Sequence, residues 1–433
     1  MQVRSTYRAT KYCVRQVPLR RIRGAWTARY LDYCTQPTTK PSDFLYCVYG
    51  SASTSKSGNA RIKMAAVFAL GSNGSGQLGI GHEEDVSVPK PVLFLAGPPT
   101  TVLSVVGGGN HTLLLGGAGE LYWSGDASSG ACGRVPEAQR QTRPGFRSME
   151  PGPPSISTSP VKMVAATWAA SVFTRRGTLG LNNEIYTCGI GEKGELGHGP
   201  LIVRLPAPER IPNFPPAGAQ VVDLAACMSH VVVVLSNGEA YGWGNGRKGQ
   251  LGSPSEIVSC PRKIDGVEFR VARAVCGKDF TCLWGDPSDG SFVLLGSDKW
   301  GLRSSIPQPA LNWRDVAAGW SNIYLLRADG ILLSWGRNDH GQSLANQSAK
   351  FRAMAVGSEH VLALSESGDV LAWGWGEHGN CGPAAPVGTT KSQPSVIVSS
   401  RYVPEGSEIA KIGAGCATSW VAIQSRRRAE SPG

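Results

Sequence analysis

Three histidines occupy equivalent places in a repeated sequence pattern, at His111, His230 and His360. An imidazole ring can act as a general acid or base, or as a metal ligand. Either chemistry needs several such side chains to converge, whereas residues that recur once per repeat are spread over the whole structure. We therefore expect these histidines to be structural, each bonding the backbone of a neighbouring strand, and we predict neither a catalytic nor a metal site.

The sequence lacks other common motifs for chemistry. It contains no Gly-x-Ser-x-Gly elbow, no lysine after a phosphate-binding glycine loop and no His-Glu-x-x-His zinc motif. The eleven cysteines include no Cys-x-x-Cys pair, and we expect Cys188, Cys227, Cys276 and Cys282 to fill small strand positions as free thiols. We therefore expect a protein without enzymatic activity or cofactor, in a reducing compartment, the cytoplasm or the nucleus.

The elements that position these residues come from a repeat that begins with an apolar run and a glycine, as in VFALGSNGSGQLG at residues 67–79. In every copy a second glycine follows five residues after the first. The first glycines are Gly71, Gly125, Gly189, Gly244, Gly296, Gly336 and Gly374, and the second are Gly76, Gly130, Gly194, Gly249, Gly301, Gly341 and Gly379. Such recurrence indicates a repeat architecture.

A second element precedes most of the glycine pairs and consists of two apolar runs separated by a short loop. The polar positions that open the second run are His111, His230, Asp279, Asn322, His360 and Thr418, with Ala170 as the exception. Turns such as Asn237-Gly238 then supply the positive φ that hairpins need. Each unit therefore contains three strands, a polar loop and a weaker outer strand. Four-stranded units of this size are typical of β-propeller blades.

The two ends of the repeat region complement each other. The first copy begins with its third strand at Val67, and the last copy, residues 409–423, ends after its second strand. Joined together, the two parts make one blade, which would leave no exposed sheet edge at the junction. We therefore predict an all-β, seven-bladed propeller in which the N-terminal strand pairs with the C-terminal hairpin.

The pattern Gly-x-Asn-x-x-Gly-Gln-Leu-Gly after an apolar strand, with Gly-x-x-His-Thr opening the inner hairpin, resembles the RCC1 repeat. The resemblance covers residues 64–425, and the second and fifth copies are degraded. Residues 295–301, for example, lack the Gln-Leu-Gly ending. The match implies an RCC1-type propeller, but the fold hosts unrelated functions.

Residues 1–63 are a different kind of sequence, with twelve basic and two acidic residues. We expect this extension to be disordered, and three interpretations are open. It resembles an organellar transit peptide, or it is a basic arm for RNA or another acidic partner, or the natural start is Met64. Because most of the net charge lies here, the nearly neutral propeller is not expected to bind nucleic acid directly.

Two further segments are expected to lie outside the blades. Residues 134–160 are rich in proline and lack apolar periodicity, which predicts a flexible insertion loop. Residues 426–433 form a basic tail. The sequence contains no apolar run long enough to span a membrane, so we expect no membrane partner.

The loop between the first two strands and the loop after the first glycine should open on one face of the propeller. Several of these loops carry large or charged side chains where small residues would suffice. Aromatic anchors in polar surroundings are typical of protein-binding hot spots. The candidate partner-binding residues are Trp168, Met228, Lys278, Trp300, Trp320, Glu359 and Trp375.

The first repeat continues as Gly-His-Glu-Glu-Asp at residues 81–85, and in this respect it resembles the fungal α-tubulin suppressor proteins of the killer-toxin-insensitivity group. That resemblance implies a propeller, monomeric by itself, whose partner is a small CSL-type zinc- or iron-binding protein. The pair would support diphthamide synthesis and Elongator-dependent modification of tRNA wobble uridines, and Elongator itself is a further candidate partner. The alternative is a guanine-nucleotide exchange factor for a Ran-like GTPase. It is the second choice because Glu359 is the one acid among fourteen compared loop positions.

Overall fold

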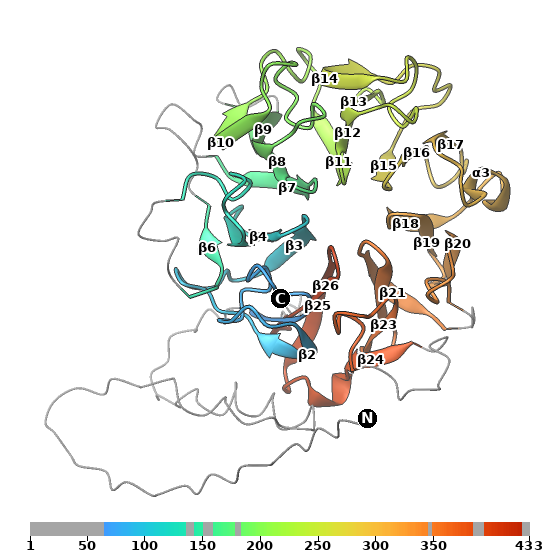
Figure 1. The fold of residues 1–433 in the computed structure, drawn as a ribbon. Coiled ribbons are helices and arrows are strands. Elements are labelled where there is room, and N and C mark those ends of the chain that lie inside the picture. Colours follow the sequence, from blue (N-terminus) through green and yellow to red (C-terminus); the bar gives the residue numbers. More distant parts are fainter. Residues whose placement is uncertain are drawn as a thin grey trace, which may run out of the picture. The chain divides into compact units, whose positions relative to one another are not determined.

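A computed structural model describes residues 65–135, 143–149, 159–177, 183–344, 349–383 and 394–426. The described part is built from short antiparallel sheets, which confirms the predicted all-β class. Figure 1 shows these sheets side by side around a common centre. The predictions for residues 1–63 and for the tail beyond Arg426 lie outside the described residues.

Each repeat forms a group of neighbouring antiparallel strands, here called a blade. Five of these groups are separate sheets, while the first blade and the blade made from both ends of the described chain are linked into one eight-stranded sheet by a parallel pair between Val106 and Ala414. Blade 1 contains β3 (Val102–Gly107), β4 (His111–Gly116), β5 (Leu121–Gly125) and β6 (Arg147–Ser148). Blade 2 contains β7 (Val161–Ala166), β8 (Ala170–Arg176), β9 (Asn183–Ile190) and β10 (Arg204–Arg210). Blade 3 contains β11 (Val221–Cys227), β12 (His230–Leu235), β13 (Ala240–Asn245) and β14 (Ile257–Lys263).

The later blades are less regular. Blade 4 contains β15 (Arg273–Cys276), β16 (Phe280–Trp284) and β17 (Phe292–Gly296), and blade 5 contains β18 (Trp313–Ala318), β19 (Asn322–Arg327) and β20 (Leu332–Gly336). Blade 6 contains β21 (Phe351–Val356), β22 (His360–Ser365), β23 (Val370–Gly374) and β24 (Ser395–Val398). After β17 the short helix α3 (Leu302–Ser305) occupies the place of the expected outer strand.

The last blade contains strands from both ends of the described chain and is called the shared blade. It consists of β25 (Ser407–Ala414), β26 (Thr418–Ser425), β1 (Ala66–Gly71) and β2 (Val86–Pro91). Strand β1 lies antiparallel to β26, from the pair Ala66–Ile423 to the pair Gly71–Thr418. The expected pairing of the N-terminal strand with the C-terminal hairpin is therefore present.

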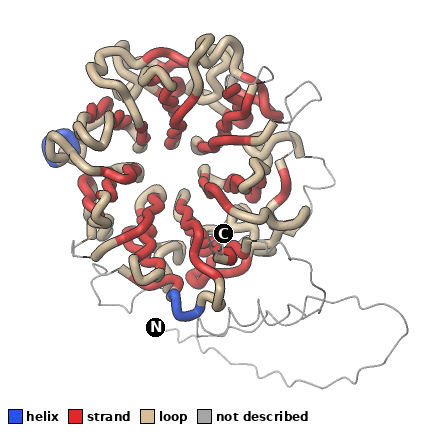
Figure 2. Tube along the Cα trace, turned by 180° about the vertical axis from the view of Figure 1, so that it is seen from behind, coloured by secondary structure: helices blue, strands red, loops and turns tan. Residues whose placement is uncertain are grey.

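Helical structure is sparse. Besides α3, the described residues contain one 3-10 turn, η1 (Ser400–Tyr402), and Figure 2 shows both segments at the outer rim of the sheets. Within the described ranges, no helix has the length and apolar character that crossing a membrane requires.

The hydrophobic core lies between adjacent blades. The second strand of each blade is buried on both faces, as in β12, where all six residues from His230 to Leu235 are buried. Tyr324 of blade 5, for example, packs in one cluster with Val361 of blade 6. Burying a large apolar side chain contributes about 1.5–3 kcal/mol. The blades are therefore held side by side chiefly by apolar packing.

The insertion expected to be flexible at 134–160 includes a segment with defined contacts. Phe146 is buried in the core between the shared blade and blade 1. Its backbone N–H donates to the carbonyl of Leu93 at 2.7 Å, and its carbonyl accepts from the N–H of Leu95 at 2.9 Å. Strand β6 then pairs with β5. Residues 143–149 thus join blade 1 to the shared blade, while residues 136–142 and 150–158 lie outside the described ranges.

Candidate functional site

The first glycine of every repeat lies directly beneath the loop that joins strands one and two of its blade. At Gly189, φ is +119°, and an added Cβ would lie 2.3 Å from the carbonyl oxygen of Ala169. The next residue, Ile190, donates its N–H to that same oxygen at 2.9 Å. All seven repeats show this arrangement, with the corresponding carbonyl oxygen 2.3–2.5 Å from the position that a Cβ would take. Only glycine fits there.

This contact fixes the arrangement of two sets of loops. The inner loops join the first and second strands, and the outer loops begin at the first glycine. Because each outer loop is hydrogen-bonded to the inner loop of its own blade, both sets lie on one face, here called the tryptophan face. This geometry agrees with the expectation that the inner and outer loops open on the same face of the propeller.

The histidines are buried and connect neighbouring blades. The Nε2 atom of His111 lies 3.1 Å from the hydroxyl oxygen of Ser171, and His230 and His360 make the same contact with Thr281 and Ser419. Each histidine therefore has a hydroxyl partner, and His230 and His360 also bond the backbone of the neighbouring strand, at Phe280 and Thr418, as expected. The hydroxyl of Ser171 donates to the carbonyl of Ala131 at 2.7 Å, so the imidazole must donate from Nε2.

Burial keeps these histidines neutral. It lowers the pKa of His111, His230 and His360 from 6.5 to about 4 in each case, because a charged imidazolium loses its hydration in the core. All three rings are buried and bonded through Nε2 to a hydroxyl of the next blade, which is compatible with the structural role expected for them. The described residues also contain no group of three or more histidine, cysteine, aspartate or glutamate side chains able to hold a metal ion.

The structure corrects the sequence alignment in blade 4. The residue paired with the first glycine, Gly296, is Phe280 and not Asp279. Phe280 fills the histidine position, and Gly277 provides the space, since a Cβ there would lie 2.0 Å from the phenyl ring. Asp279 is therefore the equivalent of Glu359, one place earlier in the inner loop. The sequence comparison missed this second acid because it required a polar residue at the histidine position.

Trp168 of blade 2 and Trp320 of blade 5 meet at the centre of the tryptophan face. Their ring centroids are 6.3 Å apart, with an interplanar angle of 43°, which is within the range of favourable aromatic pairs. The backbone N–H of Trp168 donates to the backbone carbonyl of Met228, and the backbone N–H of Lys278 donates to the backbone carbonyl of Trp320. The ammonium of Lys278 also lies 5.3 Å from the Trp320 ring centroid. These four predicted site residues are therefore brought together.

A central cavity of about 260 Å³ lies below this pair, and the inner strands of all the blades line it. Its walls consist mainly of small residues, such as Ala165, Ala225 and Ala317. Toward the other face, the Arg273 guanidinium lies 3.6 Å from a carboxylate oxygen of Asp223 and 3.1 Å from one of Asp315. The channel therefore has an aromatic end and a charged end.

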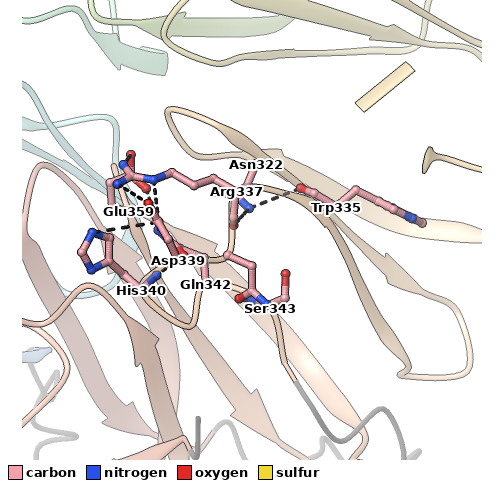
Figure 3. Close-up of polar contacts among 9 residues, drawn as sticks. Asn322, Trp335, Arg337, Asp339, His340, Gln342, Ser343 and Glu359 are labelled. Carbon is pink, nitrogen blue, oxygen red and sulfur yellow. Dashed lines mark hydrogen bonds and ion pairs between the residues drawn. The ribbon is translucent and has the colours of Figure 1, made fainter. Parts of the chain in front are cut away.

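The predicted residue Glu359 lies below the surface, with its side chain 5% exposed. Figure 3 shows its carboxylate close to Arg337 and Gln342. It accepts hydrogen bonds from Arg337 at 3.1 Å and from Gln342 at 3.0 Å. Arg337 also holds Asp339 through two hydrogen bonds, which lowers the pKa of that carboxyl. The carboxylate of Glu359 is therefore bound within the protein and is not presented to a partner.

Two other predicted tryptophans stand on the outer loops. The guanidinium of Arg337 lies 5.8 Å from the ring centroid of Trp300, and His340 stacks on Trp375 at 4.8 Å. Sequence reasoning missed the supporting roles of Arg337 and His340. Trp168, Trp300 and Trp375 are 43%, 38% and 40% exposed, so the tryptophan face presents three large aromatic side chains to solvent.

An all-β chain whose repeats form blades around a common channel is a β-propeller, and the aromatic side chains of this one gather on a loop face. The chain belongs to the RCC1-like domain family, which matches residues 66–421. The predicted resemblance to RCC1 repeats is thereby confirmed.

Several known proteins are similar to the chain. An RCC1 repeat-containing protein of Schizosaccharomyces pombe is 30% identical over 292 residues, which covers 64% of this chain and 78% of the relative. The secretion-regulating guanine nucleotide exchange factor of Mus musculus is 28% identical over 305 residues, covering 64% of this chain and 61% of the relative. The chain thus spans less than two thirds of that exchange factor.

Solved structures share the fold. Prp20p of Saccharomyces cerevisiae, described with its binding to Gsp1p and histones, gives a TM-score of 0.68 at 22% identity, covering 84% of this chain and 92% of that one. Human WBSCR16 gives 0.66 at 18% identity, covering 84% and 100%. At these identities the similarity establishes the fold alone.

Proposed function

We propose that this chain is a non-catalytic protein-binding propeller that holds its partner on the tryptophan face. The contact between Trp168 and Trp320 supports the proposal. It places aromatic side chains from two distant blades at the centre of a face whose polar surroundings would form the rim of an interface. Buried aromatic anchors within a polar rim dominate the energetics of protein interfaces.

The specific partner proposed is a small CSL-type metal-binding protein. In this proposal the pair supports diphthamide synthesis and Elongator-dependent modification of tRNA wobble uridines, as the resemblance of residues 71–92 to the α-tubulin suppressor group implies. The tryptophan face would cover the partner's metal site, and this chain would contribute no metal ligand of its own. The similarity to a fungal RCC1 repeat-containing protein is compatible with this assignment.

The second candidate is an exchange factor for a small GTPase. The name of the mouse relative favours it, and the equivalence of Asp279 with Glu359 adds an acid to the inner loops. Against it stands the position of Glu359, whose carboxylate is already bound by Arg337 and Gln342. A partner would have to displace these contacts to reach it.

The test is a titration of the purified full-length chain with a recombinant CSL-type protein and, separately, with a nucleotide-free Ran-like GTPase. Trp320→Ala should weaken the CSL complex at least about thirtyfold, because loss of an aromatic anchor typically costs about 2 kcal/mol or more. Tyr402→Ala is the control, since Tyr402 is similarly exposed but lies in η1, away from these loops. Unchanged affinity for alanine variants of Trp168, Trp320 and Trp375 would overturn the site. Tight binding of the GTPase alone would select the second candidate.

A further inference from the structure

Five exposed cations follow the tryptophan face across blades 2, 3 and 4. They are Lys193, Arg247, Lys248, Lys278 and Lys299, here called the cationic arc. Lys278 stands on an inner loop, and the other four stand in equivalent outer loops. None of the five forms an ion pair with any residue in the described ranges. These cations therefore have no ion-pair partner within the described residues, and the charge of Lys193 is felt electrostatically by Glu195.

Charges on the neighbouring sector of the same face are satisfied internally. On blade 5, Arg337 and Asp339 bind each other. On blade 6, the carboxylate of Glu377 accepts a hydrogen bond from the indole of Trp375 at 3.1 Å. Within the arc, three acids have no described ion pair, namely Glu192, Glu195 and Asp279, and the carboxylate of Glu195 accepts a hydrogen bond from the backbone N–H of Lys193 at 2.7 Å. The tryptophan face thus has one sector rich in cations without ion pairs and one sector in which the charged groups are ion-paired or hydrogen-bonded within the protein.

The aromatic rings beside the arc are already in contact with cations. Lys278 lies over Trp320 at 5.3 Å and Lys299 over Trp300 at 5.1 Å, and Arg337 also lies over Trp300. Single-stranded nucleic acids bind by stacking their bases on free aromatic faces, and these two rings have cations in that position. A cation held over a ring still offers its remaining N–H donors to an anion. This arrangement favours carboxylates over stacked bases.

We infer that the part of the partner lying across the cationic arc is an acidic polypeptide segment, with an apolar residue directed at the Trp168–Trp320 contact. Carboxylates spaced along an extended chain would pair with the arc, while the apolar residue would pack at the centre of the face. The inference rests on the proposed function, because it concerns the same binding face. It does not require that the partner be the CSL-type protein.

The experiment measures binding of a fluorescein-labelled peptide rich in Asp and Glu, with one central Leu, to the full chain by fluorescence anisotropy. A matched peptide carries Asn and Gln in place of the acids. The arc variant combines Arg247→Glu, Lys248→Glu and Lys278→Glu. The control variant combines Lys162→Glu, Arg176→Glu and Arg401→Glu, three exposed residues at the opposite ends of the blades. Both variants change the net charge equally, so the basic residues of the N-terminal extension contribute the same background.

The arc variant should bind the acidic peptide about tenfold or more weakly than the control variant, and its affinity should depend less on salt. Equal binding by the two variants, or equal binding of the acidic and neutral peptides, would overturn the inference. Tighter, arc-dependent binding of oligo(dT) would overturn it in favour of nucleic acid. If Trp320→Ala abolishes binding of the CSL-type protein while the arc variant retains it, this inference fails and the proposed function stands.

Discussion

The Nε2 atom of His360 lies 2.9 Å from the hydroxyl oxygen of Ser419, across the boundary between blade 6 and the shared blade. The hydroxyl in turn donates to the carbonyl of Asn380 at 2.8 Å, back in blade 6. His111 and His230 form the same contact across two other boundaries. A polar contact therefore accompanies the apolar packing at three blade boundaries, and burial keeps the imidazole that makes each contact neutral.

Acidic conditions should therefore destabilise the propeller. An unfolded histidine binds a proton below its ordinary pKa of 6.5, whereas the folded ones do so near 4. Between these values the unfolded state binds more protons, so stability rises with pH. The contribution is fully present above about pH 6.5 and is lost as the pH falls toward 4. Each histidine contributes up to about 1.4 kcal/mol per pH unit in this window, measurable by urea unfolding near pH 7 and pH 5.

The control for this prediction comes from the chain itself. Blade 5 carries Asn322 at the histidine position, and its amide donates to the carbonyls of Trp335 and Arg337. A variant with asparagine at positions 111, 230 and 360 should be less stable near neutral pH but should show a flatter pH dependence between about pH 6.5 and 4. If the variant keeps the slope of the unmodified chain, other groups cause the acid sensitivity.

Replacing Gly71 by alanine should weaken the shared blade. At this position φ is +116°, and the added methyl group would lie 2.3 Å from the carbonyl oxygen of Ala417 in the loop before β26. We expect a loss of at least about 2 kcal/mol in the free energy of unfolding. Gly74 belongs to the same outer loop, but it has ordinary φ and no neighbouring atom within 4 Å of its Cβ position. Gly74→Ala should therefore change stability by less than about 0.5 kcal/mol, and similar losses for both variants would contradict the explanation.

Arg337→Met should destabilise blades 5 and 6. Methionine keeps much of the apolar stem beside Trp300 but removes the guanidinium that donates to the buried carboxylate of Glu359. Loss of this donor should cost about 1–3 kcal/mol in chemical unfolding. Combining Arg337→Met with Glu359→Gln should cost less than the sum of the two single changes. Arg303→Met is the control, because the guanidinium of Arg303 is about half exposed, lies 4.0 Å from Asp298 and donates one long hydrogen bond, of 3.3 Å, to the carbonyl of Leu294, without contacting a buried carboxylate. An equally large loss of stability in Arg303→Met would show that removing any arginine of these loops destabilises the protein, whether or not it binds Glu359.

Much of the fold could be predicted because the repeat carries its own geometric constraint. Gly71 and its equivalents each approach an inner-loop carbonyl in a conformation that only glycine adopts readily. Their positions therefore locate the ends of the third strands and place the inner and outer loops on one face. Trp168 and Trp320 could be placed on that face because both belong to inner loops. The sequence did not predict that their rings are close to each other.

The remaining features depend on contacts between distant residues. Phe280 replaces a histidine because Gly277 leaves space for its ring, and a search for polar residues selects Asp279 instead. The burial of Glu359 follows from Arg337 and Gln342, which belong to the preceding blade. Phe146 stands in a proline-rich segment, and its place in the core between the shared blade and blade 1 follows from tertiary packing alone. Local patterns do not report such contacts.

The pairing of β1 with β26 also bears on how the protein is made. Ala66 leaves the ribosome early, whereas its partner Ile423 is among the last described residues to be synthesised. At translation rates of about 5–20 residues per second, the first strand spends roughly tens of seconds without that partner. During this interval its apolar residues and unpaired backbone groups are available to chaperones and to other nascent chains. Completion of the shared blade is therefore a late step that follows synthesis of the final hairpin.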